Sequence, residues 1–417
     1  MVAPLQPDPE KLAAIRVALP ATGAGIYLNT GTSGPLPAAT VRAMRELEDW
    51  EERVGRADPA GWDAFLERMD ECRGVLAALL SAGPESIALT HSTTDGMNIA
   101  TWGVDWRPGD RALTTNAEHP GLLGPLVAVR DRAGVALDIV DVEGGGDPAL
   151  IQERIAAAMT PRTRLVSLSH VLWTTGAVLP VVEIGRIARE RGAWYAVDAA
   201  QSAGAILVDA EAIGADFIAF PGQKWLLGPE GTGALWASPR AVAEALPVTA
   251  GWLSFATLDA HARGDRWPDA RRFEATNYHK PSTVGLARSV GWLEMHVGLA
   301  WAFERAGRIA RATAARLAAV PGVTLVTPQE RMATLVSFRV QGWTPLELRE
   351  ELSRRVFAIT RTVAAVDALR ISVGFFNSED ELERFAEAVA ELARHTPATL
   401  PRRPALVMLP SDAAPGA

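Results

Sequence analysis

The 417-residue sequence contains a single cysteine, Cys72, so it has neither a disulfide framework nor a cysteine-rich zinc site. We expect no bound metal. Cys72 lies in a helical pattern, FLERMDECRGVLAALL, where a half-buried structural thiol is the more common finding and a reactive thiol is the alternative.

The sequence also lacks an excess of positive charge and any long apolar run. Its 41 Lys and Arg residues face 49 Asp and Glu residues, a net charge of -8, which argues against a nucleic-acid surface or a polybasic membrane patch. No apolar run is long enough to span a bilayer. The first residues, MVAPLQPDPEKLAAIRVALP, place acidic residues and prolines ahead of the apolar part, unlike a signal peptide. We therefore expect a cytoplasmic protein.

Apolar strand-like and helix-like segments alternate from about Ile26 to Trp236, the pattern of a mostly parallel, doubly wound α/β sheet. A long helix over about 283–319 is expected to lead into a smaller α+β region. The predicted divisions are an N-terminal arm (1–25), a large domain (26–282), a small C-terminal domain (283–395) and a Pro/Ala-rich tail (396–417).

The most informative stretch is AVDAAQSAGAILVDAEAIGADFIAFPGQKWLLGPEGTGALW, residues 196–236. Asp198 closes one short apolar run, and Lys224 lies in a glycine-flanked turn after a second one. Both runs predict buried strands, and ligands of open α/β sheets bind outside the carboxyl ends of such strands. An acid and an amine should therefore face one cleft.

This pair suits pyridoxal phosphate, whose aldehyde forms a Schiff base with an enzyme lysine and whose pyridinium nitrogen takes an aspartate partner. Burial of Lys224 at a strand end would lower its pKa and make the amine nucleophilic. Taken alone, an Asp and a Lys at this spacing are more often two surface charges.

A second stretch, HSTTDGMNIATWGV, turns from a strand into a helix at Thr93 and Thr94. Hydroxyls and unpaired N–H groups at the positive end of a helix dipole form an anion site, and a phosphate is the expected occupant. The alternative is a helix cap that needs no ligand.

Several further residues are candidates for the site, and each also has an explanation that needs no ligand. The loop IYLNTGTSGPLP, which contains Asn29, is expected either to line a pocket or to form a plain turn. His119 is expected either to stack on an aromatic ring and move a proton or to lie on the surface. Trp173 walls a substrate pocket or only packs. Arg361 and Arg370, one on each of the last two strands, bind a carboxylate or form ion pairs.

In this order the motifs resemble the class V aminotransferase-fold family of pyridoxal-phosphate enzymes, which includes cysteine desulfurases, isopenicillin N epimerase-like proteins and C–S lyases. The resemblance implies fold type I, with a mostly parallel seven-stranded sheet in the large domain. It also implies a role for each of these cofactor-site residues: Thr93 and Thr94 at the phosphate, His119 of the Glu118–His119 pair on the ring, Asp198 at the ring nitrogen, Gln201 near the ring hydroxyl, Gln223 beside the lysine, and Lys224 as the Schiff-base lysine.

The same resemblance implies a homodimer with shared active sites. RFEAT (272–276) is similar to the piece that crosses to the other subunit, where Thr276 would contact phosphate. LRISVGFFNSEDEL resembles the substrate-carboxylate strand, with Arg370 as the ligand and Arg361, Asn29 and Trp173 as further substrate-binding candidates.

Three departures from the family pattern bear on the reaction. The usual Ser-x-His-Lys is Pro-Gly-Gln-Lys here, so a glutamine amide replaces an imidazole. The segment TRTVAAVDALR (360–370) has no cysteine, although desulfurases carry a nucleophilic thiol there. The Trp173 loop lacks the asparagine common in desulfurases. Persulfide transfer through this chain is therefore not expected.

The predicted function is that of a pyridoxal-phosphate enzyme acting on an amino acid by C–S or other β-elimination, or by epimerisation. Transamination is the alternative, and a non-catalytic scaffold of the same fold is a further one. A nicotinamide dehydrogenase is disfavoured, because the glycines at 228, 231 and 233 do not form GxGxxG between a strand and a helix.

Overall fold

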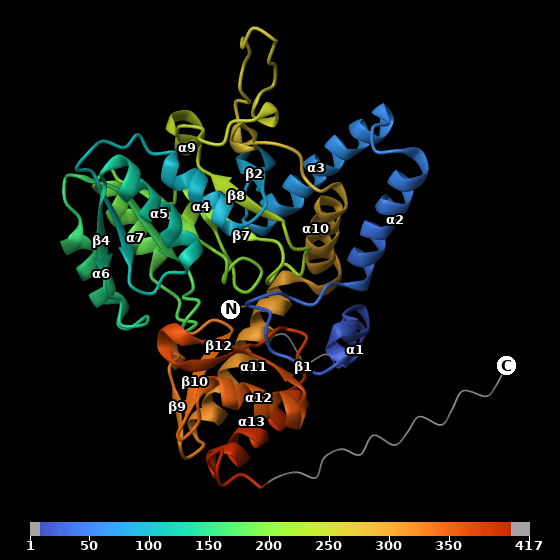
Figure 1. Cartoon of the computed structure of the whole chain (residues 1–417), viewed down its shortest axis with the longest axis vertical. Helices are drawn as coiled ribbons and strands as arrows, with labels where there is room; N and C mark the ends of the chain where they lie inside the picture. The colour runs from blue at the N-terminus through green and yellow to red at the C-terminus, as the bar shows by residue number, and fades with distance from the viewer. Residues whose placement is uncertain (1–8, 402–417) are drawn as a thin grey trace, which may run out of the picture.

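The computed structural model describes residues 9–401, which form a large upper part and a small lower part with the N-terminal helix beside it (Figure 1). Most of the predicted tail, residues 402–417, and residues 1–8 of the predicted arm lie outside the described residues. No helix within residues 9–401 has the length and apolarity to cross a bilayer.

The predicted α/β fold with a mostly parallel seven-stranded sheet is confirmed. The strand order is β2-β8-β7-β6-β5-β3-β4, and only β8 runs antiparallel to its neighbours. The strands are β2 (Ile87–Thr90), β3 (Arg111–Thr115), β4 (Ala136–Val140), β5 (Thr163–Ser169), β6 (Trp194–Asp198), β7 (Phe217–Pro221) and β8 (Gly233–Ala237).

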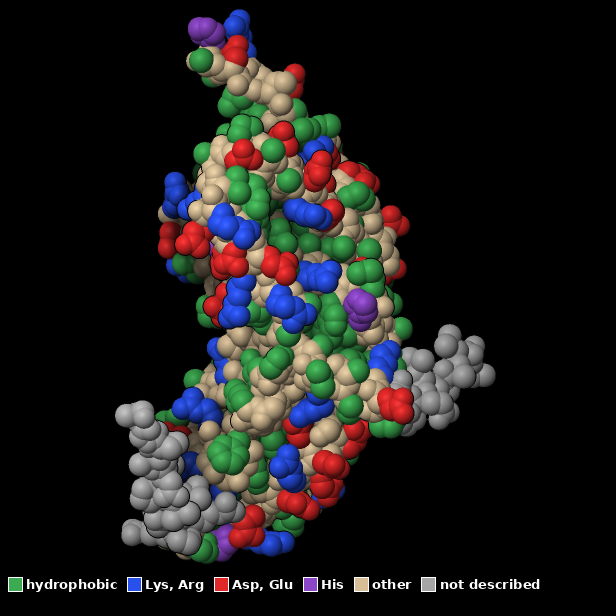
Figure 2. All heavy atoms as spheres, turned by 90° about the vertical axis from the view of Figure 1, so that its right-hand side faces the viewer, with side chains coloured by type: hydrophobic (Ala, Val, Ile, Leu, Met, Phe, Trp, Pro, Cys, Tyr) green, Lys and Arg blue, Asp and Glu red, His purple; other side chains and the backbone are tan. Residues whose placement is uncertain are grey.

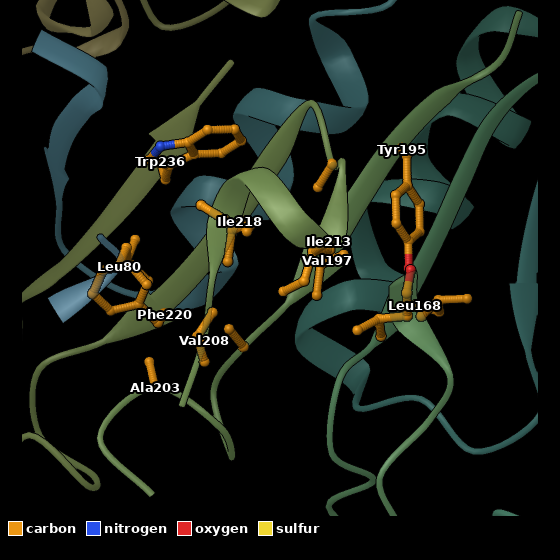
Figure 3. Close-up of a cluster of buried hydrophobic side chains, with 14 of the residues drawn as sticks. Leu80, Leu168, Tyr195, Val197, Ala203, Val208, Ile213, Ile218, Phe220 and Trp236 are labelled. Atoms are coloured by element: carbon orange, nitrogen blue, oxygen red, sulfur yellow. The ribbon is translucent and has the colours of Figure 1, made fainter. Parts of the chain in front are cut away.

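Helices cover both faces of this sheet, and the central strands are buried on both sides as parallel strands require. On β6, Tyr195 and Val197 join the core under one set of helices, while Trp194 and Ala196 join the opposite core. Figure 3 shows the first of these cores around Tyr195 and Phe220. Its helices include α3 (Pro59–Leu79), α6 (Pro148–Ala158), α7 (Val181–Glu190) and α8 (Ala210–Ile213). The opposite face carries α4 (Thr93–Trp102), α5 (Pro120–Ala133) and α9 (Pro239–Glu244).

The small part is an antiparallel sheet of order β12-β13-β10-β9 packed on helices. Its elements are α11 (Leu299–Ala318), β9 (Val323–Leu325), β10 (Leu335–Val340), α12 (Pro345–Val356), β11 (Ala358–Ile359), β12 (Arg361–Val363), β13 (Ala368–Ser372) and α13 (Glu379–Ala393). Short helical turns lie at Pro20–Gly23, Pro84–Ser86, Trp252–Ser254, Ala270–Phe273, Gln329–Arg331 and Ala364–Val366.

The N-terminal segment belongs by its packing to the small part, whereas the sequence assigned residues from 26 onward to the large domain. Strand β1 (Ile26–Tyr27) pairs in parallel with β11, and Ile26 and Leu28 are buried in the small core. Helix α1 (Pro9–Ala18) is tied there as well, because Arg16 forms an ion pair with Glu381 of α13. The chain enters the large part with α2 (Ala38–Val54).

The predicted single helix over 283–319 is wrong. Helix α10 (Lys280–Trp292) packs against α2 and α3 of the large part, and a π-helical turn at Leu293–Val297 then ends it. Gly298 follows with φ 77°, a left-handed conformation that a helix interior does not allow. Helix α11 therefore starts afresh.

Candidate active site

A pocket of about 230 Å³ lies where strand ends of the large sheet meet the small sheet. The structure brings ten of the predicted site residues to it: Thr93, Thr94, His119, Trp173, Asp198, Gln201, Gln223, Lys224, Arg361 and Arg370. They come from at least six separate segments of the chain, so their convergence is a property of the fold.

Asp198 and Lys224 share this pocket because β6 and β7 are neighbouring parallel strands whose carboxyl ends meet at one edge. Asp198 ends β6, is 5 % exposed, and accepts a 2.8 Å hydrogen bond from the Ala200 N–H. Burial raises its pKa, while the nearby Lys224 and this N–H oppose the rise. Burial also lowers the pKa of Lys224 to about 8, against the opposing effect of Asp198. The amine is therefore available in its neutral form near neutral pH.

The first turn of α4 forms the anion end of the pocket. Ser92 caps this helix by accepting a hydrogen bond from the Asp95 N–H. Since the cap is supplied by Ser92, the buried Thr93 Oγ1 has no hydrogen-bond partner among the described residues and is free for a ligand. The predicted helix cap is therefore present, and it does not preclude the predicted anion site, which stays a prediction.

A glycine keeps this anion end open. A Cβ on Gly121 would lie 2.4 Å from Thr94 Oγ1 and 3.1 Å from His119 Nδ1, closer than such atoms approach. Gly121 also donates its N–H to His119 Nδ1 at 3.0 Å. The nitrogen free to carry a proton in the neutral ring is therefore Nε2.

His119 packs edge-on against Trp173, with ring centroids 5.2 Å apart. The pKa of His119 is lowered to about 4, mainly by burial and also by repulsion from Lys224, Arg361 and Arg370. The ring is therefore neutral at physiological pH and suits an apolar stacking face better than a cationic acid.

The two glutamines of the pocket, Gln201 and Gln223, differ in whether their side-chain amides have hydrogen-bond partners. Gln201 uses both ends of its amide: Nε2 donates to the Gly31 carbonyl at 2.9 Å, and Oε1 accepts from Trp225 Nε1 at 2.9 Å. Gln223 Oε1 is buried with no partner among the described residues. Gln223 is thus the one with capacity for a ligand.

Arg370 is 1 % exposed and holds two buried nitrogens, Nε and Nη2, without a partner among the described residues. Its Nη1 donates to the Trp173 carbonyl at 2.6 Å, which fixes the fork. Burial lowers the pKa of Arg370 to about 9, and the neighbouring Arg361 adds to the effect. A buried guanidinium with free donors is stabilised by a carboxylate.

Two predicted residues lie outside this pocket. Asn29 is one step removed: its Oδ1 accepts from Thr32 Oγ1 at 2.8 Å, and Thr32 Oγ1 accepts from Arg361 Nη1 at 2.9 Å. Asn29 thus orients Arg361 and does not line the cavity, because Thr32 stands between them. Thr276 is exposed, and it does not line the pocket of its own chain.

Thr32, Gly31 and Gly121 also line the cavity, although the sequence analysis did not name them individually. A Cβ on Gly31 would lie 2.8 Å from Ser372 Oγ and 3.0 Å from Gln201 Oε1. Glycines in the loops TGTSG and HPG were the available signal, because close backbone approach requires glycine.

The residues fit pyridoxal phosphate by the chemistry of their groups. Thr93, Thr94 and the start of α4 offer hydroxyl and N–H donors to a phosphate dianion. Asp198 offers a carboxylate to a pyridinium, and Lys224 offers a neutral amine to an aldehyde. The unpartnered Thr93 Oγ1 and Gln223 Oε1 are the observations that point to a ligand.

This fold and lysine site define a class of pyridoxal-phosphate-dependent α/β enzymes, and comparison with known proteins places the chain within it. The family model "Aminotransferase class-V" matches residues 26–385, and the chain belongs to this family. The predicted enzyme class and its cofactor are thereby confirmed.

Relatives carry two kinds of activity in their names. A probable cysteine desulfurase of Methanothermobacter thermautotrophicus is 30% identical over 386 residues, 88% of this chain and 94% of its own length. An isopenicillin N epimerase of Streptomyces clavuligerus is 32% identical over 388 residues, 88% of this chain and 94% of its own length.

Solved structures similar to this chain include a third kind of enzyme, a C–S lyase. The cystine C–S lyase C-DES in complex with its product cysteine persulfide has a TM-score of 0.84 and 28% identity, covering 89% of this chain and 99% of that chain. A lysine-to-alanine mutant of C-DES, with glycine covalently linked to the PLP cofactor, has a TM-score of 0.85 and 28% identity, covering 92% and 99%.

Proposed function

We propose that this protein is a pyridoxal-phosphate-dependent C–S lyase that cleaves S-substituted cysteines by β-elimination. The observation that carries the proposal is the short β12–β13 hairpin, in which Arg361 and Arg370 lie opposite each other and only eight residues separate them. None of those eight is a cysteine. A sulfur atom removed from the substrate would therefore have no acceptor on this segment.

The only thiol of the chain does not compensate for this absence. Cys72 is 0 % exposed within α3, and burial raises its pKa to about 12. A thiol that stays protonated and out of reach does not accept sulfur. We infer that sulfur leaves directly into solution as a thiolate or a persulfide.

When bound, pyridoxal phosphate supplies an electron sink for the α-carbon of an attached amino acid. Thr93 and Thr94 would hold its phosphate, Asp198 its pyridinium nitrogen, and His119 one face of its ring. Arg370 would hold the substrate carboxylate through its two free nitrogens. Held in this way, the substrate would present its α-C–H bond to Lys224.

Lys224 Nζ is the group suited to move the α-proton, because burial lowers its pKa to about 8. His119 is less suited, since its Nδ1 already accepts from Gly121 and its pKa is lowered to about 4. In the net reaction the α-C–H and Cβ–S bonds break, and sulfur leaves with the electron pair. Water then releases pyruvate and ammonia.

The test is to incubate the cofactor-loaded protein with cystine, other S-substituted cysteines and cysteine, and to measure pyruvate, ammonia and persulfide. Pyruvate and ammonia should appear in equal amounts, and Cys72→Ala should retain the rate. Loss of activity in a folded Cys72→Ala protein would instead support a desulfurase.

Epimerisation is the second candidate, favoured by the 32% identity to isopenicillin N epimerase. It shares the removal of the α-proton and differs in returning a proton to the other face. Racemised substrate without pyruvate would establish it, and a keto acid formed with the aminated cofactor would establish transamination. The cytoplasmic location stays a prediction.

We further propose a homodimer with shared sites and a two-domain division of each subunit. A groove of about 840 Å³ opens between α2, α3 and α10, lined by apolar residues such as Leu47, Phe65 and Val284 and edged by charges of both signs (Figure 2). A second copy of this chain suits the groove. In a two-fold dimer the same surface of both subunits meets, so a patch that carries charges of both signs can pair the positive charges of one copy with the negative charges of the other.

The segment around 255–266 supports the same proposal. It projects from the large part as a narrow loop, closed by a bridge between Phe255 and Arg266 (Figure 1). The following Thr276 is exposed and would reach the phosphate of the partner. Such a projection has little to contact within its own chain.

A further inference from the structure

The carboxylate of Glu118 is buried directly beside the pocket without lining it. Glu118 is 5 % exposed and accepts three hydrogen bonds. Thr115 Oγ1 donates to its Oε1 at 2.7 Å, and the Ser169 N–H donates to its Oε2 at 2.9 Å. The Ser169 hydroxyl also donates to Oε2. The carboxylate therefore joins the end of β3 to the end of β5.

These three bonds fix two parts of the candidate site at once. The residue after Glu118 is His119, which begins α5 and lines the pocket. Ser169, on the other side, is the direct partner of Asp198 in the β5–β6 register, and the next N–H, that of His170, donates to the Asp198 carbonyl at 2.9 Å. Glu118 thus lies between the proposed ring-stacking residue and the proposed ring-nitrogen partner.

The position also brings a second buried acid close to Asp198. Burial raises the pKa of Glu118 to about 7, its hydrogen bonds oppose the rise, and the charge of Asp198 adds to it. Tyr195 of β6 is the other titratable group that interacts with Glu118, and it stays neutral because burial raises its pKa. When it is ionised, Glu118 adds its negative charge to that of Asp198, and two negative charges on one side of the pocket favour a cation within it.

We propose that Glu118 is a positioning residue of this active site, which clamps the His119 loop to the strand end beside Asp198 and, when ionised, adds a negative charge beside the pocket. The inference rests on the proposed contacts of His119 and Asp198 with the cofactor ring. It requires no contact between Glu118 and the ligand. The charge and the clamp are separable by substitution.

Glu118→Gln separates them, because the amide oxygen still accepts from Ser169 while the charge is lost. Glu118→Ala removes the clamp as well. Asp216→Asn is the matched control: Asp216 is 7 % exposed and accepts from the Tyr195 N–H at 2.9 Å, near the opposite end of β6. It is a buried acid directly before β7 of the same sheet, and it does not line the pocket.

The experiment titrates the visible absorbance of the bound cofactor with pH in each holoprotein and measures cofactor affinity by adding it to apoprotein. In Glu118→Gln the absorbance midpoint should fall by about half to one pH unit, since loss of a neighbouring negative charge favours deprotonation. Glu118→Ala should also bind the cofactor about tenfold more weakly, a cost of about 1.4 kcal/mol. Asp216→Asn should match the wild type.

An unshifted midpoint in Glu118→Gln, or an equal shift in Asp216→Asn, would overturn the inference. If Glu118→Ala does not fold, Glu118→Gln alone decides it. Failure of the proposed C–S lyase function is distinguishable, because it would show as absence of pyruvate with S-substituted cysteines while the cofactor titration of the wild type and of Glu118→Gln could still be measured.

Discussion

Arg361 and Arg370 are direct cross-strand partners in the antiparallel pair β12–β13. Neither has an acidic partner among residues 9–401, and the positive charge of Arg361 lowers the pKa of Arg370. Two like charges directly opposite each other repel, and a bound anion would relieve this repulsion. The pair therefore supports the proposed role of Arg370 as the ligand of a substrate carboxylate, with Arg361 beside it.

Arg370→Lys should lower kcat/KM by about ten- to a hundredfold, because a point charge replaces a planar fork worth about 1.5–3 kcal/mol. Arg361→Lys should have a smaller effect, since one of its nitrogens is already bound to Thr32. Steady-state kinetics measures both. The control is Arg339→Lys on β10, whose arginine donates to the Val366 carbonyl outside the pocket. Equal losses at all three positions would contradict the assignment.

The lowered pKa of Lys224 predicts how the apoprotein takes up its cofactor. Only the neutral amine bonds to an aldehyde, so the rate of cofactor uptake should rise about tenfold per pH unit and level off near pH 8. With an unperturbed lysine the rate would rise up to about pH 10.4. Asp198→Asn should move the midpoint to lower pH, because the charge of Asp198 raises the pKa of Lys224. Stopped-flow absorbance measures the profile, and a rise continuing above pH 10 would refute the prediction.

The site of attachment is also open to a direct test, since the chain has three lysines: Lys11, Lys224 and Lys280. Borohydride reduction of the holoprotein followed by peptide mapping should place the label on Lys224. Lys280 is the internal comparison, because it is held in an ion pair with Glu51. A label on either other lysine would refute the assignment.

Shared sites predict complementation between two inactive subunits. Lys224→Ala mixed with the triple variant Arg272→Ala, Thr276→Ala, Asn277→Ala should regain activity, because one site of each mixed dimer carries only native residues. Thr276→Ala alone should weaken cofactor binding about ten- to a hundredfold, the loss of one hydrogen bond to a charged group. No recovery after proven subunit exchange, or an active monomer, would exclude the arrangement.

The segment that carries Thr276 is anchored by a buried ion pair between Arg73 of α3 and Glu274, 2.7 Å apart. Arg73→Met should lower the free energy of unfolding by about 3–5 kcal/mol, because Glu274 is left buried and unpaired. The exposed pair of Arg68 and Glu71 on the same helix is the control, and Arg68→Met should cost about 0–1 kcal/mol. Urea denaturation measures both.

The loss of unfolding free energy in Arg73→Met should depend on pH, and its direction follows from the raised pKa of Glu274. Burial raises the pKa of Glu274, so the folded state binds its proton more tightly than the unfolded state does. Stability of the variant should therefore recover as the pH falls below neutrality. A deficit that grows at low pH would contradict this account.

The sequence predicted the large sheet and most of the pocket for one physical reason. Residues that follow buried parallel strands must emerge at a common edge, so Asp198 and Lys224 were identifiable from strand ends alone. Arg361 and Arg370 were identifiable because arginine within a strand requires an anion.

The rest depends on contacts between distant segments. Asn29 was placed in the pocket because its loop reaches it, but the hydroxyl of Thr32 stands between them. The two-residue strand β1 has no periodicity to read, and its partner β11 lies more than 300 residues away. The break after Trp292 had one local sign, Gly298, within an otherwise helical pattern.

The pairing of Ile26 with Ala358 has a consequence for biosynthesis. A ribosome exposes the α1–β1 segment first, yet its partner strand emerges only when the chain is almost finished. Until then Ile26 and Leu28 lack their core, and the catalytic cleft lacks both arginines. A nascent or prematurely terminated chain that ends before Arg361 thus lacks the proposed carboxylate ligands, so on the proposed assignment substrate binding depends on the last part of the chain to be synthesised.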